Sequence, residues 1–485
     1  MNNPAVWLLA ALLAPCALLA VRYWQRALFA VFVLMVFEGA LRKWAFPSAQ
    51  AQLYLVKDAI LLAVYLGFIL DSRKKLPSPK GLDLIKIVLG IGFVFGCMEV
   101  FNPNSPSILV GLMGVKTYFL YAPVAFILPY AIKSREHLFV LIRRYLIMAI
   151  PVAVLGFVQI MAGPGSSLNT YVSHSEDSEA VLSYFGEENF VRTSGTFSYI
   201  SGYTAFLSFI GFLAIGYNMT RGWRLKKNIA PVLALALVIG AMFTTGSRGP
   251  VWTLLATSPV ILWLAASRGV LSSRTAMRLC VLIPVIAIVA LSASPQATEA
   301  FMARAAGGGS SETLDRLFSP LYQTIMALSD GPALGMGIGA THPSAMTIMG
   351  ADWPWWLQDL ITEDEMARVT VELGVIGLIL VYSLRLLIAA FALRCAMTFK
   401  DPSYRALGIV LAVYLALGII EPIMLNVTLG LYYWGSLGLV LTMRRLEQSA
   451  GARFGTIPVR RADQITKLQP VMPMGGVAIG VHPDG

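Results

Sequence analysis

Apolar runs of about 17 to 25 residues recur along the chain, and short polar or charged segments separate them. Such runs match a bilayer core of about 30 Å, and they must be helices because lipid cannot satisfy open backbone groups. The pattern predicts an all-α, polytopic integral membrane protein with about 12–13 transmembrane helices. The predicted spans are 5–21, 25–40, 51–70, 83–101, 109–132, 139–162, 200–219, 229–244, 250–267, 279–294, 369–393, 406–421 and 427–443.

The composition supports this fold class. Of 485 residues, 57% are hydrophobic and only 13% are charged, which is too little polar surface to cover a soluble globule of this size. The first apolar run lacks a basic segment before it, so we expect a retained helix rather than a cleaved signal peptide. The four cysteines stand singly without a CxxC pair, and we expect them to be small buried residues.

Connectors rich in Lys and Arg alternate along the chain with connectors that are not. The basic connectors lie at 73–75, 133–135, 221–227, 268–278, 394–405 and from 444 onward, and each consecutive pair encloses two spans. The positive-inside rule places them in the cytoplasm. The N-terminus is left open: thirteen helices would place it outside and twelve inside.

On this topology residues 1–443 form one transmembrane domain with two long external loops, 163–199 and 295–368. Residues 444–485 form a basic cytoplasmic tail that we expect to be disordered. The net charge of +11 then reflects topology, because the basic residues are spread over cytoplasmic connectors, and it does not indicate a nucleic-acid partner.

Nine basic residues lie on the external side against this bias. They are Arg42, Lys43, Lys57, Lys116, Arg192, Arg248, Arg304, Arg316 and Arg368. The planar fork of arginine suits a bidentate grip on phosphate or carboxylate. We therefore expect an outward-facing site for an anionic, lipid-borne headgroup. The alternative is a set of structural ion pairs with the external acidic residues.

The loop 295–368 has internal order. Ser311 to Leu328 carries leucine and isoleucine at helical spacing, which predicts an amphipathic helix on the membrane surface. A G-x-G-x-G turn follows at 334–339, and then His342, which is either a general base active near neutral pH or a solvated loop histidine. No spacing typical of a metal site occurs, so we expect neither a metal nor a cofactor.

Four stretches together resemble the O-antigen ligase and polymerase superfamily. Residues 245–249 (TGSRG) are similar to its T-x-S-R-G signature and 191–197 (VRTSGTF) to its R-x-x-G-T-F segment. Residues 372–377 (ELGVIG) resemble its E-x-G-x-x-G helix start, and Arg304, Arg316 and the 331–337 turn resemble its arginine-containing loop. The resemblance covers about residues 185 to 380.

The resemblance implies a GT-C-like, metal-independent inverting glycosyltransferase of the bacterial inner membrane. Such enzymes transfer a glycan from an undecaprenyl-pyrophosphate carrier at the periplasmic face, either to another lipid-linked glycan or to a lipid A core. Arg192 and Arg248 would grip the donor pyrophosphate, with Arg316 as a further candidate. Arg304, Arg368 and Lys116 complete the cationic set that we expect at this site. The expected partners are the lipid-linked oligosaccharide, the bilayer, and a chain-length regulator or export machinery.

The chain departs from the family pattern in one place. Ligases carry a His-Asn pair about nine residues before the glutamate of E-x-G-x-x-G, and here Glu363 and Asp364 stand there. The base would then be Glu363, Asp364, Glu365 or His342. This departure favours an O-antigen or exopolysaccharide polymerase over a ligase. A lipid-linked glycan flippase or secondary transporter is the alternative from another class, although no internal repeat supports it.

Overall fold

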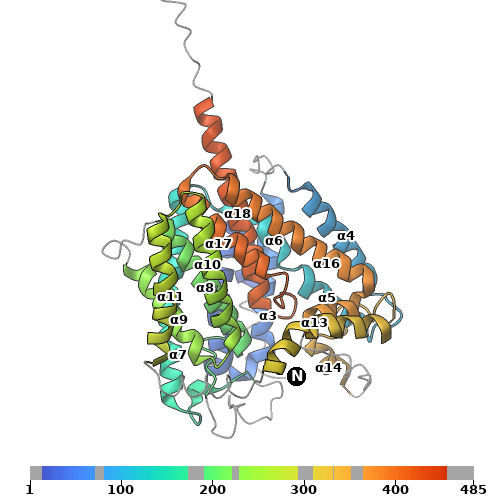
Figure 1. The fold of residues 1–485 in the computed structure, drawn as a ribbon. Coiled ribbons are helices and arrows are strands. Elements are labelled where there is room, and N and C mark those ends of the chain that lie inside the picture. The colour runs from blue at the N-terminus through green and yellow to red at the C-terminus, as the bar shows by residue number, and fades with distance from the viewer. Residues whose placement is uncertain are drawn as a thin grey trace, which may run out of the picture. The chain divides into compact units, whose positions relative to one another are not determined.

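The computed structural model describes residues 14–71, 81–172, 191–220, 229–292, 310–330, 332–350 and 364–455. Within these ranges the chain is helical and has no β-strand, which confirms the predicted all-α class (Figure 1). The chain divides into two compact units, Met1–Glu447 and Gln448–Gly485, and the candidate site lies in the first. The predicted loops 163–199 and 295–368 lie partly outside the described residues.

Six α-helices lie between residues 24 and 162 of the part that the structure describes. They are α2 (Trp24–Ala40), α3 (Gln50–Leu70), α4 (Asp83–Glu99), α5 (Ile108–Phe119), α6 (Ala122–Ala131) and α7 (Arg135–Ala162). A π-helical turn, η1 (Leu41–Ala45), extends α2. The predicted span 109–132 is bent by 42° between α5 and α6. A proline in the first turn of α6 suits this break, because it has no N–H to continue the preceding helix.

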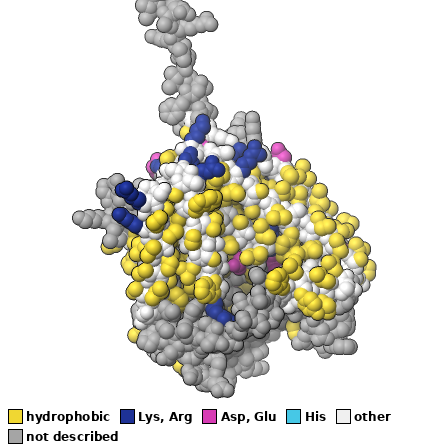
Figure 2. Space-filling view, in the orientation of Figure 1, with side chains coloured by type: hydrophobic (Ala, Val, Ile, Leu, Met, Phe, Trp, Pro, Cys, Tyr) yellow, Lys and Arg dark blue, Asp and Glu magenta, His cyan; other side chains and the backbone are white. Residues whose placement is uncertain are grey.

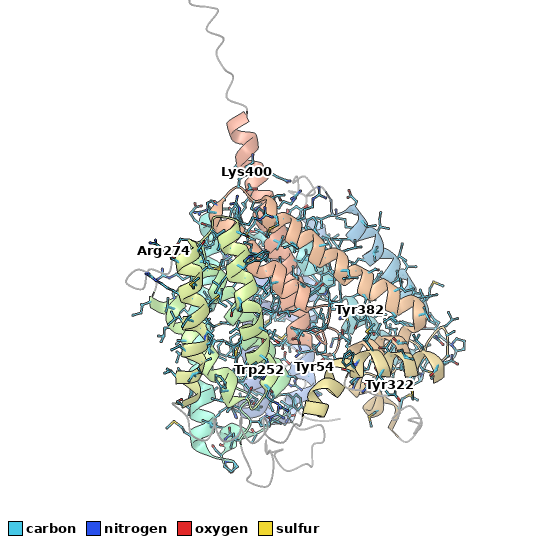
Figure 3. The ribbon with its side chains drawn as sticks, in the orientation of Figure 1. Tyr54, Trp252, Arg274, Tyr322, Tyr382 and Lys400 are labelled. Carbon is cyan, nitrogen blue, oxygen red and sulfur yellow. The ribbon has the colours of Figure 1, made fainter. Side chains whose placement is uncertain are left out.

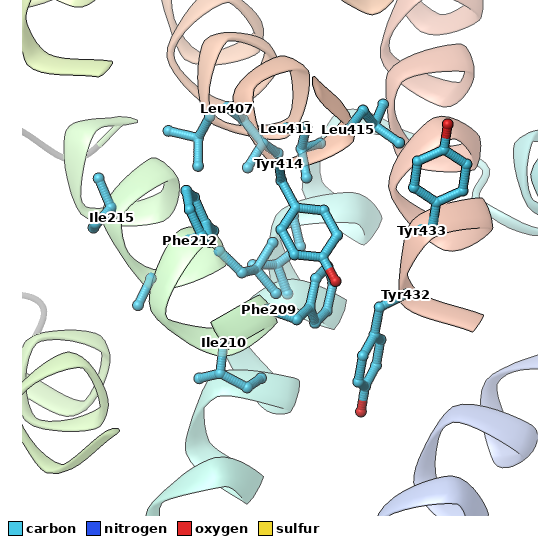
Figure 4. Packing of buried hydrophobic residues seen from close by; sticks show 14 of the residues in the cluster. Phe209, Ile210, Phe212, Ile215, Leu407, Leu411, Tyr414, Leu415, Tyr432 and Tyr433 are labelled. Carbon is cyan, nitrogen blue, oxygen red and sulfur yellow. The ribbon is translucent and has the colours of Figure 1, made fainter. Parts of the chain in front are cut away.

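The centre of the bundle is built on α8 (Ile200–Thr220), which follows the 191–197 segment and is buried along most of its length. It packs against α9 (Ile229–Thr244) and α17 (Pro402–Leu417). Aromatic rings fill the space between α8 and the last helix, with the rings of Phe209 and Tyr432 stacked 4.3 Å apart (Figure 4). The remaining helices are α10 (Arg248–Ser267), α11 (Ser273–Ser292), α13 (Ser310–Asp330), α14 (Pro343–Met349), α16 (Glu365–Thr398) and α18 (Val427–Gly455).

Helix α13 confirms the helix predicted at 311–328. Leu321 and Ile325 are exposed on one side, whereas Thr324 and Ala327 are buried on the side that packs against α16. Its predicted position on a membrane surface stays a prediction. Helix α18 continues to Gly455, so the boundary predicted at 443 falls inside a helix.

Helix α16 is two helices joined at a sharp bend. Gly374 has φ 61° and ψ −161°, a conformation that favours glycine. Glu365 and Arg385 form an ion pair across this bend. Twenty residues of straight helix would separate them by about 30 Å, so the chain must fold back between them. The continuous helix predicted over 369–393 is therefore wrong at its start, and the apolar part of α16 begins after Gly374.

Six helices among the described residues are long and apolar enough to cross a bilayer, or up to seven if the bent pair α5 and α6 counts as one span. Helices α9 and α17 are apolar but shorter. The structure is therefore that of a polytopic membrane protein, and the full number of 12–13 spans stays a prediction.

Charged and apolar side chains separate along the bundle. On the face drawn in Figure 2, most of the visible Lys and Arg side chains gather at one end and a broad apolar band lies below them. Figure 3 places Arg274 and Lys400 at this basic end, and Tyr54, Trp252 and Tyr322 toward the opposite end. Arg274 and Lys400 belong to two of the connectors predicted to be cytoplasmic.

Candidate functional site

The turn between α9 and α10 carries the T-x-S-R-G residues. Thr244 ends α9 and Arg248 begins α10. The Thr245 hydroxyl donates back into the last turn of α9 and accepts a hydrogen bond from the backbone N–H of Ser247 at 3.1 Å. Gly246 has φ +62°, which an L side chain rarely adopts. These local bonds close the turn and place Arg248 at the first position of the next helix.

Arg192 lies against this turn. Its Nε donates to the Thr245 carbonyl at 3.3 Å, and its Nη2 donates to the Ser247 hydroxyl at 3.1 Å. The neighbouring Thr193 joins the two segments, since its backbone N–H donates to the Thr244 carbonyl at 3.2 Å. Burial lowers the pKa of the Arg192 guanidinium from its ordinary value. The structure thus joins the two arginine-bearing motifs into one site.

Arg248 is in a different state from Arg192. Its side chain is half-buried, and among the residues that the structure describes its guanidinium has no hydrogen-bond or ion-pair partner. Because Arg192 occupies the carbonyl of Thr245 and the hydroxyl of Ser247, these groups of the turn are already used. A half-buried cation without a counter-charge is costly, and an anionic ligand would remove that cost.

The segment that carries Arg192 is tied to the end of α2 by two basic side chains. Lys43 Nζ donates to the Ser194 hydroxyl at 3.0 Å and to the Gly195 carbonyl at 2.8 Å. Arg42 Nη1 donates to the Ser198 hydroxyl at 3.0 Å. These two members of the predicted cationic set therefore hold the position of the Arg192 segment.

Two buried ion pairs lie beside this anchor. Lys57 Nζ is 2.8 Å from Glu38, and Lys116 Nζ is 2.6 Å from Asp58. The Tyr54 ring lies between them, with the two ammonium groups 4.0 and 4.3 Å from its centroid. For these two lysines the structure supports the alternative of structural ion pairs, and Lys116 also faces the next part of the site.

His342 lies where Lys116 and Arg368 come near each other. The surrounding cavity is lined by Thr117, Tyr118, Gly339, His342, Glu365, Arg368, Glu372, Met424 and Leu425. Burial, and after it the charges of Lys116 and Arg368, lower the pKa of His342 to about 4. The imidazole is therefore neutral at pH 7. An anion bound near these two cations would raise this pKa toward its ordinary value, because it would cancel their repulsion of the imidazolium.

The carboxylate of Glu372, in the E-x-G-x-x-G motif, is hydrogen-bonded within the protein. It accepts hydrogen bonds from the backbone N–H groups of Gly339 and Thr341, both at 3.0 Å. It also accepts from the hydroxyls of Thr341 at 2.6 Å and of Tyr118 at 2.8 Å. Glu372 therefore fixes the loop that carries His342.

The glycines of the G-x-G-x-G turn serve close packing of backbone on backbone. A Cβ at Gly335 would lie 2.5 Å from the Glu372 carbonyl oxygen, and one at Gly339 would lie 2.7 Å from the Cα of Gly114 on α5. Gly335 and Gly339 have φ of +83° and +85°. The close approach for which these glycines are needed is to α16 and α5, rather than to a ligand.

Two of the three candidate carboxylates are held by the protein. Glu365 pairs with Arg385 and accepts the backbone N–H of Met424 at 2.6 Å. Asp364 accepts the Ser319 hydroxyl of α13 at 2.6 Å. Both side chains therefore connect elements of the fold, and His342 is the candidate base that lies among cations.

The side chains of three predicted site residues lie outside the part of the chain that the structure describes. Arg304 and Glu363 lie outside the described residues, as does the side chain of Arg316, whose backbone belongs to α13. Sequence analysis missed Arg385, which lies inside the predicted span 369–393 and pairs with Glu365. A charge inside the apolar run 369–393 was the available signal, because such a residue needs a partner at membrane depth.

Among the described residues no group of three or more His, Cys, Asp or Glu side chains is arranged to hold a metal ion. Comparisons with protein-family models and with curated proteins gave no match.

Proposed function

We propose that this protein is a polysaccharide polymerase of the bacterial inner membrane. It would transfer a glycan from an undecaprenyl-pyrophosphate donor to a lipid-linked acceptor at the periplasmic face. The observation that carries the proposal is that Arg192 and Arg248 both lie at the turn between α9 and α10. Among the described residues Arg248 has no hydrogen-bond or ion-pair partner there. Guanidinium groups in this position suit a pyrophosphate, whose oxygens accept paired hydrogen bonds.

Contacts extend from the arginine turn to His342. Arg42, beside the Arg192 segment, pairs with Glu38 at 3.4 Å, and Glu38 also pairs with Lys57. The Tyr54 ring connects Lys57 to Lys116, whose charge acts on His342. A chain of contacts through buried ion pairs thus links the arginine turn, where the pyrophosphate would bind, to His342, where the acceptor hydroxyl would lie.

The reaction is a single displacement. The acceptor hydroxyl oxygen forms a bond to the anomeric carbon while the bond from that carbon to the pyrophosphate oxygen breaks, so the configuration inverts. Arg192 and Arg248 stabilise the charge that grows on the leaving pyrophosphate, which is greatest in the transition state. His342, whose buried imidazole is neutral at pH 7, takes the proton of the acceptor hydroxyl.

Two other functions would also require cationic groups at this site. An O-antigen ligase would transfer the glycan to a lipid A core, and the Glu363 and Asp364 positions speak against it because the family's ligases have His-Asn there. A flippase or transporter would move the lipid without breaking a bond, and it would leave His342 without a role.

The test is transfer by purified protein in detergent with a lipid-pyrophosphate-linked repeat unit, read as glycan mobility on a gel. Arg192→Lys and Arg248→Lys keep the charge but lose the planar fork. Arg274→Lys, exposed in the first turn of α11, is the matched control. We expect a ladder of products from wild type and the control, and none from the two site variants.

Other results would favour the alternatives. A single transfer that requires added lipid A core would favour the ligase. Binding of labelled lipid without transfer to either acceptor would favour a flippase or transporter. A full ladder from Arg248→Lys would remove the bidentate contact from the mechanism.

A further inference from the structure

Glu421 is a half-buried acidic residue in the turn that follows α17. Its carboxylate takes part in no hydrogen bond or ion pair with the residues that the structure describes. The charge that acts on it within this part of the chain is that of Glu365, which has the same sign and repels it. Because a carboxylate beside apolar helices normally has a partner, an unpaired one indicates a place for a ligand.

Few acidic side chains reach the surface on the predicted external side. On the face drawn in Figure 2, acidic side chains are visible within the lower part of the apolar band. Among the external acidic residues whose burial the structure describes, Asp364 and Glu421 are half-buried. The others are buried: Glu38, Asp58, Glu99, Glu365 and Glu372. Asp364 accepts the hydroxyl of Ser319, so Glu421 is the half-buried carboxylate that remains available.

A second polar group without a partner lies near Glu421. The Tyr414 hydroxyl, in the last turn of α17, is buried and has no hydrogen-bond partner among the described residues. It is close enough to Glu421 for the charge of that carboxylate to act on it. A carboxylate accepts hydrogen bonds, and a hydroxyl both donates and accepts them. Together the two groups suit a ligand that carries hydroxyl groups.

The turn that carries Glu421 connects the two parts of the proposed site. It begins at the end of α17, which packs against α10, and α10 begins at Arg248. It then reaches Met424 and Leu425, which line the cavity of His342. In the proposed reaction the pyrophosphate binds at the arginine turn and the anomeric carbon faces the acceptor hydroxyl at His342. The sugar of the donor would therefore lie against the turn that carries Glu421.

We propose that Glu421 binds the sugar next to the pyrophosphate of the donor, by accepting hydrogen bonds from its hydroxyl groups. This inference rests on the proposed function, since it takes the ligand of the arginine turn to be a glycosyl pyrophosphate. Arg248 and Glu421 carry opposite charges, and neither has an ion-pair partner among the described residues. A pyrophosphate satisfies the guanidinium and sugar hydroxyls satisfy the carboxylate, so one glycosyl pyrophosphate serves both.

A conservative substitution isolates the carboxylate. Glu421→Gln keeps the shape of the side chain and removes its charge and one acceptor oxygen. The melting temperature in detergent should change little, because no described hydrogen bond or ion pair is lost. Glu136→Gln, exposed in the first turn of α7 on the predicted cytoplasmic side, is the matched control. Glu421→Asp keeps the charge but withdraws it by one methylene group, and it takes the place of Glu421→Gln if that variant does not fold.

The experiment compares the binding of two lipids to purified protein in detergent. The first is the lipid-linked repeat unit extracted from cells that lack this protein, and the second is the same polyprenyl pyrophosphate with its glycan removed. We expect Glu421→Gln to bind the glycosylated lipid roughly 10-fold more weakly than wild type, because hydrogen bonds to a charged group contribute on that scale. Its affinity for the lipid without sugar should equal that of wild type. Glu136→Gln should bind both lipids like wild type.

The outcomes that would contradict this inference differ in what else they affect. Equal affinity of wild type and Glu421→Gln for the glycosylated lipid would overturn it and leave the proposed function intact. Equal losses for both lipids would also overturn it, because Glu421 would then act on the pyrophosphate site through the fold rather than on the sugar. If wild type binds neither lipid, the proposed function fails with it.

Discussion

The basic residues that disobey the positive-inside bias are satisfied in two different ways. Lys57 and Lys116, on α3 and α5, each lie within 2.8 Å of a buried carboxylate. Arg192 is held instead by a carbonyl and a hydroxyl, and Arg248 has neither a carboxylate nor a hydrogen-bond acceptor among the described residues. Lys57 and Lys116 are neutralised within the fold, whereas no described carboxylate neutralises Arg248.

This difference separates structural charges from those available to a substrate. A buried ion pair stabilises the fold only while both partners are present, and it offers little to a ligand. An arginine that no described carboxylate faces, such as Arg248, keeps its attraction for an anion. Basic residues on the predicted external side therefore identify a charged region of the protein. Those without a neighbouring carboxylate are the ones that can act on a substrate.

The largest effect should come from Arg248→Ala. We expect glycan transfer to fall about 100- to 1,000-fold, since one preorganised donor in the transition state contributes on that scale. The melting temperature in detergent should change little, because no described hydrogen bond or ion pair is lost. Transfer assays and thermal unfolding check both expectations, with Arg274→Ala as the control. A clear loss of stability with unchanged transfer would place Arg248 among the structural charges.

Breaking the ion pair between Lys57 and Glu38 should instead lower the stability of the fold. Lys57→Met leaves the Glu38 carboxylate buried without its ammonium partner, and we expect a loss of about 3–5 kcal/mol in unfolding free energy. Adding Glu38→Gln should restore much of that loss, because the unpaired charge is then removed. Unfolding of the two single variants and the double variant measures this coupling. Strict additivity would show that the pair does not stabilise the fold.

A smaller loss should follow from Glu372→Gln. The carboxylate accepts hydrogen bonds from four donors, and an amide replaces one acceptor oxygen with an N–H group that faces them. We expect a loss of about 1–3 kcal/mol in unfolding free energy, as for a buried donor left without its acceptor. Glu447→Gln, on α18, is the matched control and should cost less, because this carboxylate accepts two backbone N–H groups, those of Lys400 and Asp401, at a more exposed place. Equal effects would contradict the role of Glu372 in fixing the loop.

The smallest effect concerns pH. The pKa of His342 is about 4 in the folded protein, below its ordinary value of 6.5. Between these two values the unfolded chain binds the proton and the folded protein does not. His342 therefore favours the folded state fully above pH 6.5, and this contribution is lost as the pH falls toward 4. We expect wild type to lose more stability than His342→Asn over this window.

Thermal unfolding of the two proteins across pH 4 to 7 measures this difference. The nearby carboxylates Glu365 and Glu372 are present in both proteins, so their titration largely cancels in the comparison. Parallel curves for wild type and His342→Asn would show that the imidazole is not buried among cations.

Much of the fold could be predicted from the sequence. The apolar runs at 25–40 and 200–219 became α2 and α8 within a few residues, because a bilayer-spanning segment needs a length and a composition that are local properties. The helix at 311–328 was found from its spacing in the same way. The bend in α16 was not predicted, because Gly374 lies inside an apolar run and only its contact with Ala333 requires the turn.

The sequence by itself determined which residues break the membrane pattern, since one arginine or glutamate in an apolar region is visible without any partner. Only the tertiary structure decided what each of them does. Lys57 and Arg248 look alike in sequence, yet the first meets Glu38, 19 residues away along the chain, and the second meets no described partner. The reason is physical: an ion pair acts over a few ångströms, and those distances between remote segments are set only when the helices pack.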